Sequence, residues 1–234
     1  MSDFHDKDRL IVALDVPSAA EAEQLIEKIG SAAGFYKIGY QLAPVGGFKL
    51  AEALSANGKK VFLDLKYHDI GATVEKGVKS VRQVGADLLT VHAERDVVKA
   101  AVEGRGDDPR LKIMAVTVLT SLGQADIEAA GFSMKLEDLV IKRAELAAEC
   151  GADGVIASAH EAARIRERLG DQLLIVTPGV RPSGASVDDQ KRVVTPAAAR
   201  AAGADAVVVG RPITQAADPA SVAAAIAAEL SETN

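Results

Sequence analysis

A regular alternation of short apolar runs with longer amphipathic stretches constrains the fold of this chain more than any other feature. The apolar runs contain few polar residues, which is typical of parallel strands buried on both faces. They predict strands over residues 10–15, 35–38, 61–66, 88–92, 112–119, 154–157, 173–177 and 206–209. The amphipathic stretches predict helices over residues 19–29, 48–56, 73–84, 96–103, 136–150, 159–169, 196–202 and 219–230.

Eight strand–helix units in 234 residues predict a compact (β/α)8 barrel of the TIM type. A doubly wound open sheet is the alternative, although such a sheet usually has fewer strands. No change in composition and no Pro- or Gly-rich linker divides the chain, so we expect a single domain over residues 1–234. Three Gly-Ala-Asp triplets, at 85–87, 151–153 and 203–205, each lie between a helix and a strand, where a structural role is expected.

The composition excludes several classes of protein. Hydrophobic residues make up 48% of the chain, which excludes a disordered protein. No apolar run approaches the roughly 18 residues that span a bilayer, and the first eight residues are too polar and acidic for a signal peptide. The single Cys150 excludes an internal disulfide, and the net charge of −6 argues against a nucleic-acid partner. The sequence therefore predicts a cytoplasmic protein with no membrane or nucleic-acid partner.

Charged residues lie at the carboxyl ends of the first three predicted strands. Asp64 and Lys66 are two residues apart on one strand and therefore point to the same side. Alone, they would be read as a structural ion pair. Asp15 and Lys37 end the two preceding strands, so four alternating charges can converge where barrel enzymes carry their active sites. We therefore expect this set to be catalytic.

The predicted chemistry follows from the charges around Lys66. Neighbouring carboxylates hold a lysine in its protonated form, which suits a general acid and not a Schiff-base nucleophile. The same carboxylates repel an anionic group on a bound substrate. That repulsion destabilises a substrate carboxylate more than the transition state that is losing it. The array therefore favours decarboxylation followed by protonation of carbon.

The last strand is followed by a pattern that predicts a phosphate site. Gly210, Arg211 and Pro212 end the strand and begin a short helix, whose free N–H groups can bind phosphate. An arginine at a surface turn is the alternative reading. The long segment 177–194 contains Arg181 and Gln190, which could close over a ligand, although a merely flexible loop is equally compatible with its composition.

The remaining polar positions carry less information. His92 ends the fourth strand with no visible partner, so a structural histidine is the simpler interpretation. No spacing of His, Cys and carboxylates predicts a metal site, and no Gly-rich motif follows the first strand. The sequence thus predicts neither a metal nor a cofactor.

The segment 64–73, Asp-Leu-Lys-Tyr-His-Asp-Ile-Gly-Ala-Thr, resembles the signature of the orotidine 5′-monophosphate decarboxylase family. The resemblance covers nearly the whole chain. The chain departs from the usual family pattern at Gly71 and Ala72, where Pro-Asn is common, and at Glu94, where Gly is usual. Further matching segments, in the family's order, are 13–15, 36–39, 116–121, 177–181 and 209–214.

The resemblance implies a homodimeric enzyme that converts orotidine monophosphate to uridine monophosphate without a metal or cofactor. It implies that Lys66 protonates carbon 6 of the pyrimidine while Asp64 and the partner subunit's Asp69 crowd the departing carboxylate. The implied substrate contacts are Asp15 and Lys37 at the ribose, Thr73 from the partner subunit, Thr120 at the pyrimidine, and Arg181, Gln190, Gly210 and Arg211 at the phosphate, with Gln190 bridging towards the base.

Two other functions remain open at this point. Related sugar-phosphate enzymes, such as 3-keto-L-gulonate 6-phosphate decarboxylase, share the Asp-x-Lys-x-x-Asp pattern but use magnesium. They carry an acidic residue where this chain has Lys37, which argues against them. A non-catalytic nucleotide-binding module would keep Arg211 and Gln190 but would not need Lys66 between carboxylates. Binding without turnover would identify such a module.

Overall fold

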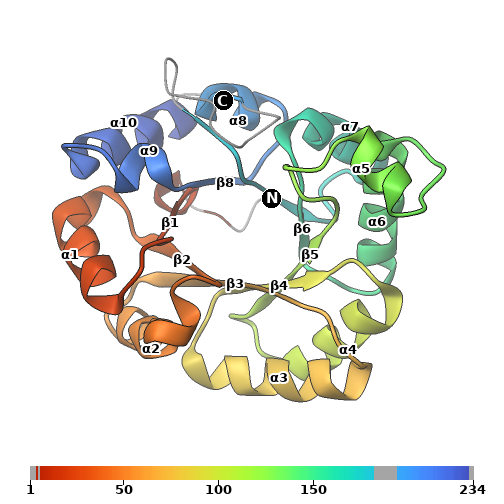
Figure 1. Ribbon diagram of the computed structural model, residues 1–234, viewed down its shortest axis with the longest axis horizontal. Coiled ribbons are helices and arrows are strands. Elements are labelled where there is room, and N and C mark those ends of the chain that lie inside the picture. The colour runs from red at the N-terminus through yellow and green to blue at the C-terminus, as the bar shows by residue number, and fades with distance from the viewer. Residues whose placement is uncertain (1–3, 5, 182–193, 232–234) are drawn as a thin grey trace.

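The computed structural model describes Phe4 and residues 6–181 and 194–231. Eight parallel strands form a closed barrel in chain order, and the last strand pairs with the first (Figure 1). The predicted (β/α)8 architecture is therefore confirmed. The strands are β1 (Leu10–Ala13), β2 (Phe35–Gly39), β3 (Lys60–Tyr67), β4 (Leu88–His92), β5 (Lys112–Val116), β6 (Gly154–Ile156), β7 (Leu174–Thr177) and β8 (Ala206–Val209).

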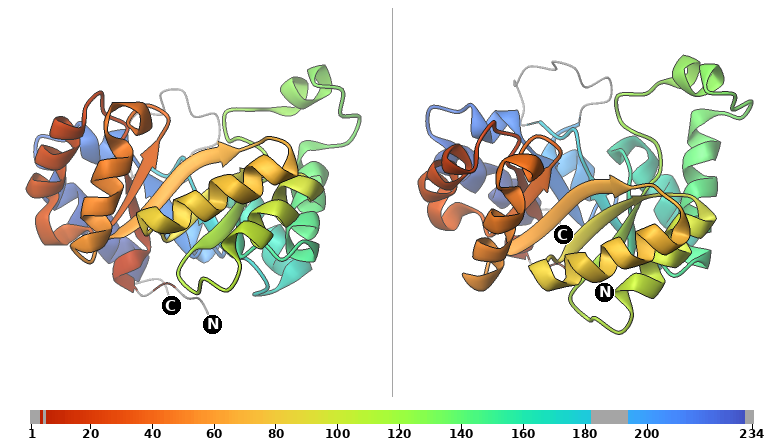
Figure 2. Two further views of the ribbon diagram at one scale, coloured as in Figure 1. Left: turned by 90° about the horizontal axis from the view of Figure 1, so that it is seen from below. Right: turned by 60° about the horizontal axis from the view of Figure 1, so that its bottom comes forward.

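Helices surround the barrel as an outer ring, and α5 with its flanking segments stands out from that ring (Figures 1 and 2). The Ser18 hydroxyl accepts a hydrogen bond from the backbone N of Glu21 at 3.2 Å and so caps the start of α1. The helices are α1 (Ala19–Ile29), α2 (Gly47–Ala56), α3 (Gly71–Val84), α4 (Arg95–Arg105), α5 (Gln124–Ala129), α6 (Leu136–Glu149), α7 (Ala159–Leu169), α8 (Pro196–Ala201), α9 (Arg211–Thr214) and α10 (Pro219–Ser231), with short 3-10 turns η1 (Asp6–Asp8), η2 (Gly30–Ala32) and η3 (Ala43–Val45).

The fifth strand is shorter than predicted, and the helix α5 was not predicted. The apolar run extends to residue 119, but β5 ends at Val116. Its neighbour β6 ends at Ile156, which pairs with Val116, so the residues that follow have no strand to pair with. The segment after β5 instead lines a hollow at the barrel mouth.

Strand alternation positions the charged residues inside the barrel. Phe35, Phe62 and Leu88 belong to an apolar cluster that is separate from the main core. Phe4 is part of the same cluster, and its ring centre lies 6.1 Å from that of Phe35. The side chains two residues further along these strands point the same way but lie nearer the carboxyl ends. These side chains are Lys37, Asp64 and Thr90.

The Gly-Ala-Asp triplets lie at the opposite, amino-terminal ends of the strands. Each aspartate accepts a hydrogen bond from a backbone N–H near the start of the preceding strand, and each also pairs with an arginine. The backbone bonds are Val61 N to Asp87 at 2.8 Å, Ile113 N to Asp153 at 2.8 Å, and Ile175 N to Asp205 at 2.7 Å. These contacts agree with the structural role expected from the sequence.

Replacement of Asp205 by alanine should lower the free energy of unfolding by about 3 kcal/mol, because it leaves the Arg166 guanidinium and the Ile175 N–H without their buried acceptor. Urea unfolding measures this loss. Asp171 also pairs with Arg166, at 3.7 Å, but its side chain is 84% exposed, so Asp171→Ala is the matched control and should cost under about 0.5 kcal/mol. Equal losses in the two variants would contradict this account.

Within the described residues, no helix is both long enough and apolar enough to cross a membrane.

Candidate active site

Four charged side chains form a continuous array at the mouth of the barrel. Lys37 on β2 has its Nζ 3.1 Å from Asp15 Oδ1, just after β1, and 3.4 Å from Asp64 Oδ2 on β3. Lys66 Nζ lies 2.7 Å from Asp64 Oδ1. The structure thus brings together the four residues that the sequence placed at neighbouring strand ends, with the signs of their charges alternating.

Asp64 lies at the centre of this array, between the two lysines. Burial raises the pKa of its carboxyl, but the charges of Lys37 and Lys66 outweigh that effect. Hydrogen bonds from Lys66 and Thr90 act in the same direction, and the net pKa lies below the ordinary value. Asp64 is therefore a carboxylate at neutral pH and can repel a second anion placed beside it.

The absence of a side chain at Gly39 leaves room for this array. A Cβ atom on Gly39 would lie 3.2 Å from Lys37 Nζ and 3.4 Å from Asp15 Oδ1. Both atoms belong to the ion pair that links β1 to β2. The glycine therefore leaves space in which the Lys37 ammonium reaches two carboxylates.

Lys66 lies in a bulge, which the simple alternation of the strand does not predict. The pairing of β3 with β4 shifts register between Leu63 and Tyr67. Lys66 has φ of 44°, and it is the one residue other than glycine with positive φ in the described part of the chain. Such a conformation is strained for a side chain with a Cβ and is often associated with functional sites.

Two adjoining hollows open beside the array and share Lys37 and Asp64. The first, of about 410 Å³, is mainly polar, and its lining includes Asp15, Gln41, Arg181, Gly210 and Arg211. The second, of about 250 Å³, is largely apolar, and its lining includes Phe62, Lys66, Val116, Val118, Thr120 and Ile156. A ligand with one anionic end and one flat, weakly polar end fits this pair of hollows.

Most of the predicted binding residues therefore line these hollows. Arg211 begins α9, and Gly210 directly precedes it, so the start of α9 lies at the polar hollow. Arg181 and Thr120 are buried, with 6% and 8% of their surfaces exposed. Gln190 lies outside the described residues, so the predicted closure by its loop stays a prediction.

Asp69 and Thr73 do not line either hollow. They lie past the end of β3, in a separate hollow that also includes Tyr40 and Lys66. Among the described ion pairs, Asp69 makes none with Lys66 of its own chain. Ile70 beside it is the most exposed of the large hydrophobic residues in the described chain, at 78%. Among the described ion pairs, Asp69 therefore does not join the array of its own chain.

The loop that carries Asp69 is tied to the next strand by contacts that the sequence did not reveal. His68 Nε2 lies 2.8 Å from Glu94 Oε2, and the His68 and His92 rings are 4.8 Å apart. Burial lowers the pKa of His92, and His68 lowers it further, so His92 is neutral at pH 7. The departure from the family pattern at Glu94 thus supplies a partner for His68.

Two further residues contact the bulge, and sequence reasoning missed both. Thr90 on β4 bonds to Asp64 and to the backbone of Lys66, and Tyr40 bonds to the carbonyl of Leu65. Thr90 does carry a sequence signal, because it is the only polar residue among positions 88–91. Tyr40 carries none, because its contact depends on how β2 and β3 lie together.

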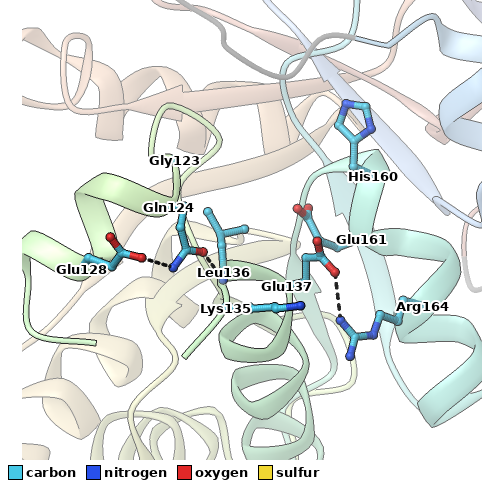
Figure 3. Close-up of a pocket in the computed structure, with 9 residues that line it drawn as sticks. All are labelled: Gly123, Gln124, Glu128, Lys135, Leu136, Glu137, His160, Glu161 and Arg164. Carbon is cyan, nitrogen blue, oxygen red and sulfur yellow. Dashed lines mark hydrogen bonds and ion pairs between the residues drawn. The ribbon is translucent and has the colours of Figure 1, made fainter. Parts of the chain in front are cut away.

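An open hollow between α5, α6 and α7 lies apart from the array (Figure 3). Several of its polar groups bond to each other. Gln124 Nε2 donates to Glu128 Oε1 at 2.8 Å, and Arg164 pairs with Glu137 at 3.4 Å (Figure 3). It has no chain of alternating charges, so we place the active site at the barrel mouth instead.

Among the described residues, no three His, Cys, Asp or Glu side chains form a group that could hold a metal ion. The carboxylates of the array face lysines instead.

Comparison with known proteins identifies the family. Residues 8–226 match the model of the orotidine 5′-phosphate decarboxylase / HUMPS family. Proteins named orotidine 5′-phosphate decarboxylase are 58% identical in Methylorubrum extorquens, over 97% of both chains, and 60% identical in Methylobacterium radiotolerans, over 96% of both. The crystal structure of orotidine 5′-phosphate decarboxylase from Lactobacillus acidophilus aligns with TM-score 0.85 at 35% identity, covering 95% of this chain and 99% of that one. The chain therefore belongs to the orotidine 5′-phosphate decarboxylase / HUMPS family.

Proposed function

We propose that this chain is a single catalytic domain that decarboxylates orotidine 5′-monophosphate to uridine 5′-monophosphate in pyrimidine synthesis. The observation that carries the proposal is the unbroken array Asp15–Lys37–Asp64–Lys66 between a polar and an apolar hollow. A nucleotide has matching parts, with a phosphate and ribose at one end and a pyrimidine at the other. Family membership supports the same reaction.

In the proposed mechanism, the substrate carboxylate lies next to the ionised Asp64. Repulsion between these two anions is relieved as the bond from carbon 6 to the carboxylate breaks. Carbon dioxide leaves, and the electron pair stays on carbon 6. Lys66 then donates a proton to that carbon and becomes a neutral amine, which takes a new proton from water.

The other residues bind and orient the nucleotide. Asp15 and Lys37 hold the ribose hydroxyls, and Thr120 contacts the pyrimidine. Gly210 and the guanidinium groups of Arg181 and Arg211 hold the phosphate. Gln190 bridges from the phosphate towards the base.

The proposed active form is a homodimer in which the partner subunit's Asp69 and Thr73 complete each site. The exposure of Asp69 and Ile70 supports this arrangement, because Asp69 makes no described ion pair with its own Lys66. A two-fold axis makes such an exchange reciprocal.

Metal-dependent decarboxylation of a sugar phosphate, the reaction of the related enzymes that share the Asp-x-Lys-x-x-Asp pattern, is the alternative. Lys37 argues against it, because its ammonium lies within 3.4 Å of carboxylate oxygens of both Asp15 and Asp64, and a cation already beside these oxygens disfavours a magnesium ion there. We therefore propose a reaction that needs no metal and no cofactor.

The substrate is tested by measuring carbon dioxide release from two compounds. We expect purified protein to release one carbon dioxide per uridine 5′-monophosphate formed from orotidine 5′-monophosphate, and none from 3-keto-L-gulonate 6-phosphate. Release from the sugar phosphate alone would contradict the proposed function. Tight nucleotide binding without any release would support a binding module.

Replacement of Arg211 by alanine should lower kcat/KM for the nucleotide by about a hundredfold, roughly 3 kcal/mol, because a charged bond to phosphate is lost. The same change should scarcely affect turnover of orotidine, which has no phosphate. Steady-state kinetics with both substrates measure the difference. Arg168, an exposed arginine paired with Glu145 on the outer helices, is the control position. Equal losses on nucleotide and nucleoside would place Arg211 away from the phosphate.

A further inference from the structure

The Thr90 hydroxyl links the two central side chains of the array. It donates a hydrogen bond to Asp64 Oδ1 at 2.9 Å and accepts one from the backbone N of Lys66, also at 2.9 Å. A hydroxyl has one proton and two lone pairs, so it can make both bonds at once. Thr90 is fully buried, so water does not readily replace it.

We propose that Thr90 is a positioning residue for decarboxylation, which holds the Lys66 ammonium and the Asp64 carboxylate in fixed positions relative to each other. The proposal rests on the proposed function, because it assigns Thr90 to that reaction. It also makes a structural claim that can be tested without turnover: the Thr90 hydroxyl keeps Lys66 in its bulged conformation.

The bulge needs such support because it leaves backbone groups without strand partners. The register shift between Leu63 and Tyr67 interrupts the ladder to β4, and the pairing with β2 ends at Asp64. Thr90 binds the freed N–H of Lys66. On the other side, the Tyr40 hydroxyl donates to the Leu65 carbonyl at 2.7 Å. Two side-chain hydroxyls therefore bond two of the backbone groups in the bulge.

The same contacts aim the Lys66 side chain. Its Nζ lies 2.7 Å from Asp64 Oδ1 on one side and 5.6 Å from the centre of the Tyr40 ring on the other. A lysine with positive φ could relax to an ordinary extended backbone if these bonds were lost. Its ammonium would then move away from the carbon that it must protonate, and a misplacement of about 1 Å can cost about a hundredfold in rate.

The experiment uses Thr90→Val, which keeps the branched shape, and Thr90→Ser, which keeps the hydroxyl. The control is Thr117→Val, because the Thr117 hydroxyl is also buried but donates only to the Ile156 carbonyl, at 2.9 Å, outside the array. We expect Thr90→Val to lower kcat by about a hundredfold while changing the Kd for uridine 5′-monophosphate less than about threefold. Thr90→Ser should restore kcat to within about tenfold of the wild type, whereas Thr117→Val should change it little.

Amide hydrogen exchange at Lys66 tests the structural claim independently of activity. Loss of its acceptor in Thr90→Val should speed exchange of the Lys66 N–H by about tenfold or more, with little change in Thr90→Ser. Tyr40→Phe tests the other side of the bulge from an exposed position and should lower kcat with KM unchanged. Its control is Tyr36→Phe, because Tyr36 also donates to a backbone carbonyl, that of Ala33 at 3.2 Å, away from the array.

The outcomes separate this proposal from the proposed function. If the wild-type protein turns over and Thr90→Val behaves as Thr117→Val does in kcat and in Lys66 exchange, Thr90 has no positioning role. If the wild-type protein does not decarboxylate the nucleotide, the proposed function and the catalytic role of Thr90 both fail. Exchange at Lys66 then decides the structural claim by itself: faster exchange in Thr90→Val supports it, and unchanged exchange overturns it.

Discussion

Replacement of Lys66 by alanine is expected to lower kcat by on the order of 10⁴-fold, because it removes the ammonium at the end of the array, which lines the apolar hollow and is the proposed proton donor. Lys66 acts mainly in the transition state, so affinity for uridine 5′-monophosphate should change far less than kcat. Single-turnover kinetics and equilibrium binding of that nucleotide measure the two effects separately.

The control for this change is a lysine outside the site. Lys79 on α3 is exposed and pairs only with Glu75 of its own helix among the described ion pairs, so Lys79→Ala should leave kcat within about twofold. Lys66→Ala with near-native kcat would remove Lys66 from the role of proton donor.

Mixing two inactive variants should restore activity if each site is shared between subunits. Lys66→Ala and Asp69→Ala homodimers should each be nearly inactive. In a hybrid dimer, one site carries both defects and the other carries neither. Random exchange makes about half of the dimers hybrid, with one intact site each, so activity should reach about a quarter of the wild-type value per subunit.

The control for the mixing experiment is a mixture of Lys66→Ala with the double variant Lys66→Ala/Asp69→Ala. No dimer in that mixture has an intact site, so activity should stay absent. Native mass spectrometry of differently tagged subunits establishes that exchange has occurred. If subunits exchange and the first mixture stays inactive, Asp69 acts within its own chain and the shared site is wrong.

Much of the fold follows from local sequence patterns. The apolar runs at 88–92 and 206–209 coincide with β4 and β8 because buried parallel strands need apolar residues at nearly every position. The charged array was also predictable, since strand alternation places Asp64 and Lys66 on one side and the topology brings β1, β2 and β3 together.

The bulge at Lys66 could not be predicted in the same way. Its register shift depends on the pairing of β3 with β4, and its hydroxyl partners, Thr90 and Tyr40, come from two different strands or strand ends. No local pattern signals that combination. The end of β5 at Val116 could not be predicted from local sequence either, because it depends on where the neighbouring strand β6 ends.

The most direct test of the central claim is the loss of orotidine 5′-monophosphate absorbance with purified protein in excess EDTA. In the proposed mechanism, catalysis comes from the alternating charges of Asp15, Lys37, Asp64 and Lys66, whose carboxylates are paired with lysines. This mechanism predicts turnover at the same rate with and without the chelator, and no increase when magnesium is added. Turnover that EDTA abolishes and magnesium restores would contradict the account.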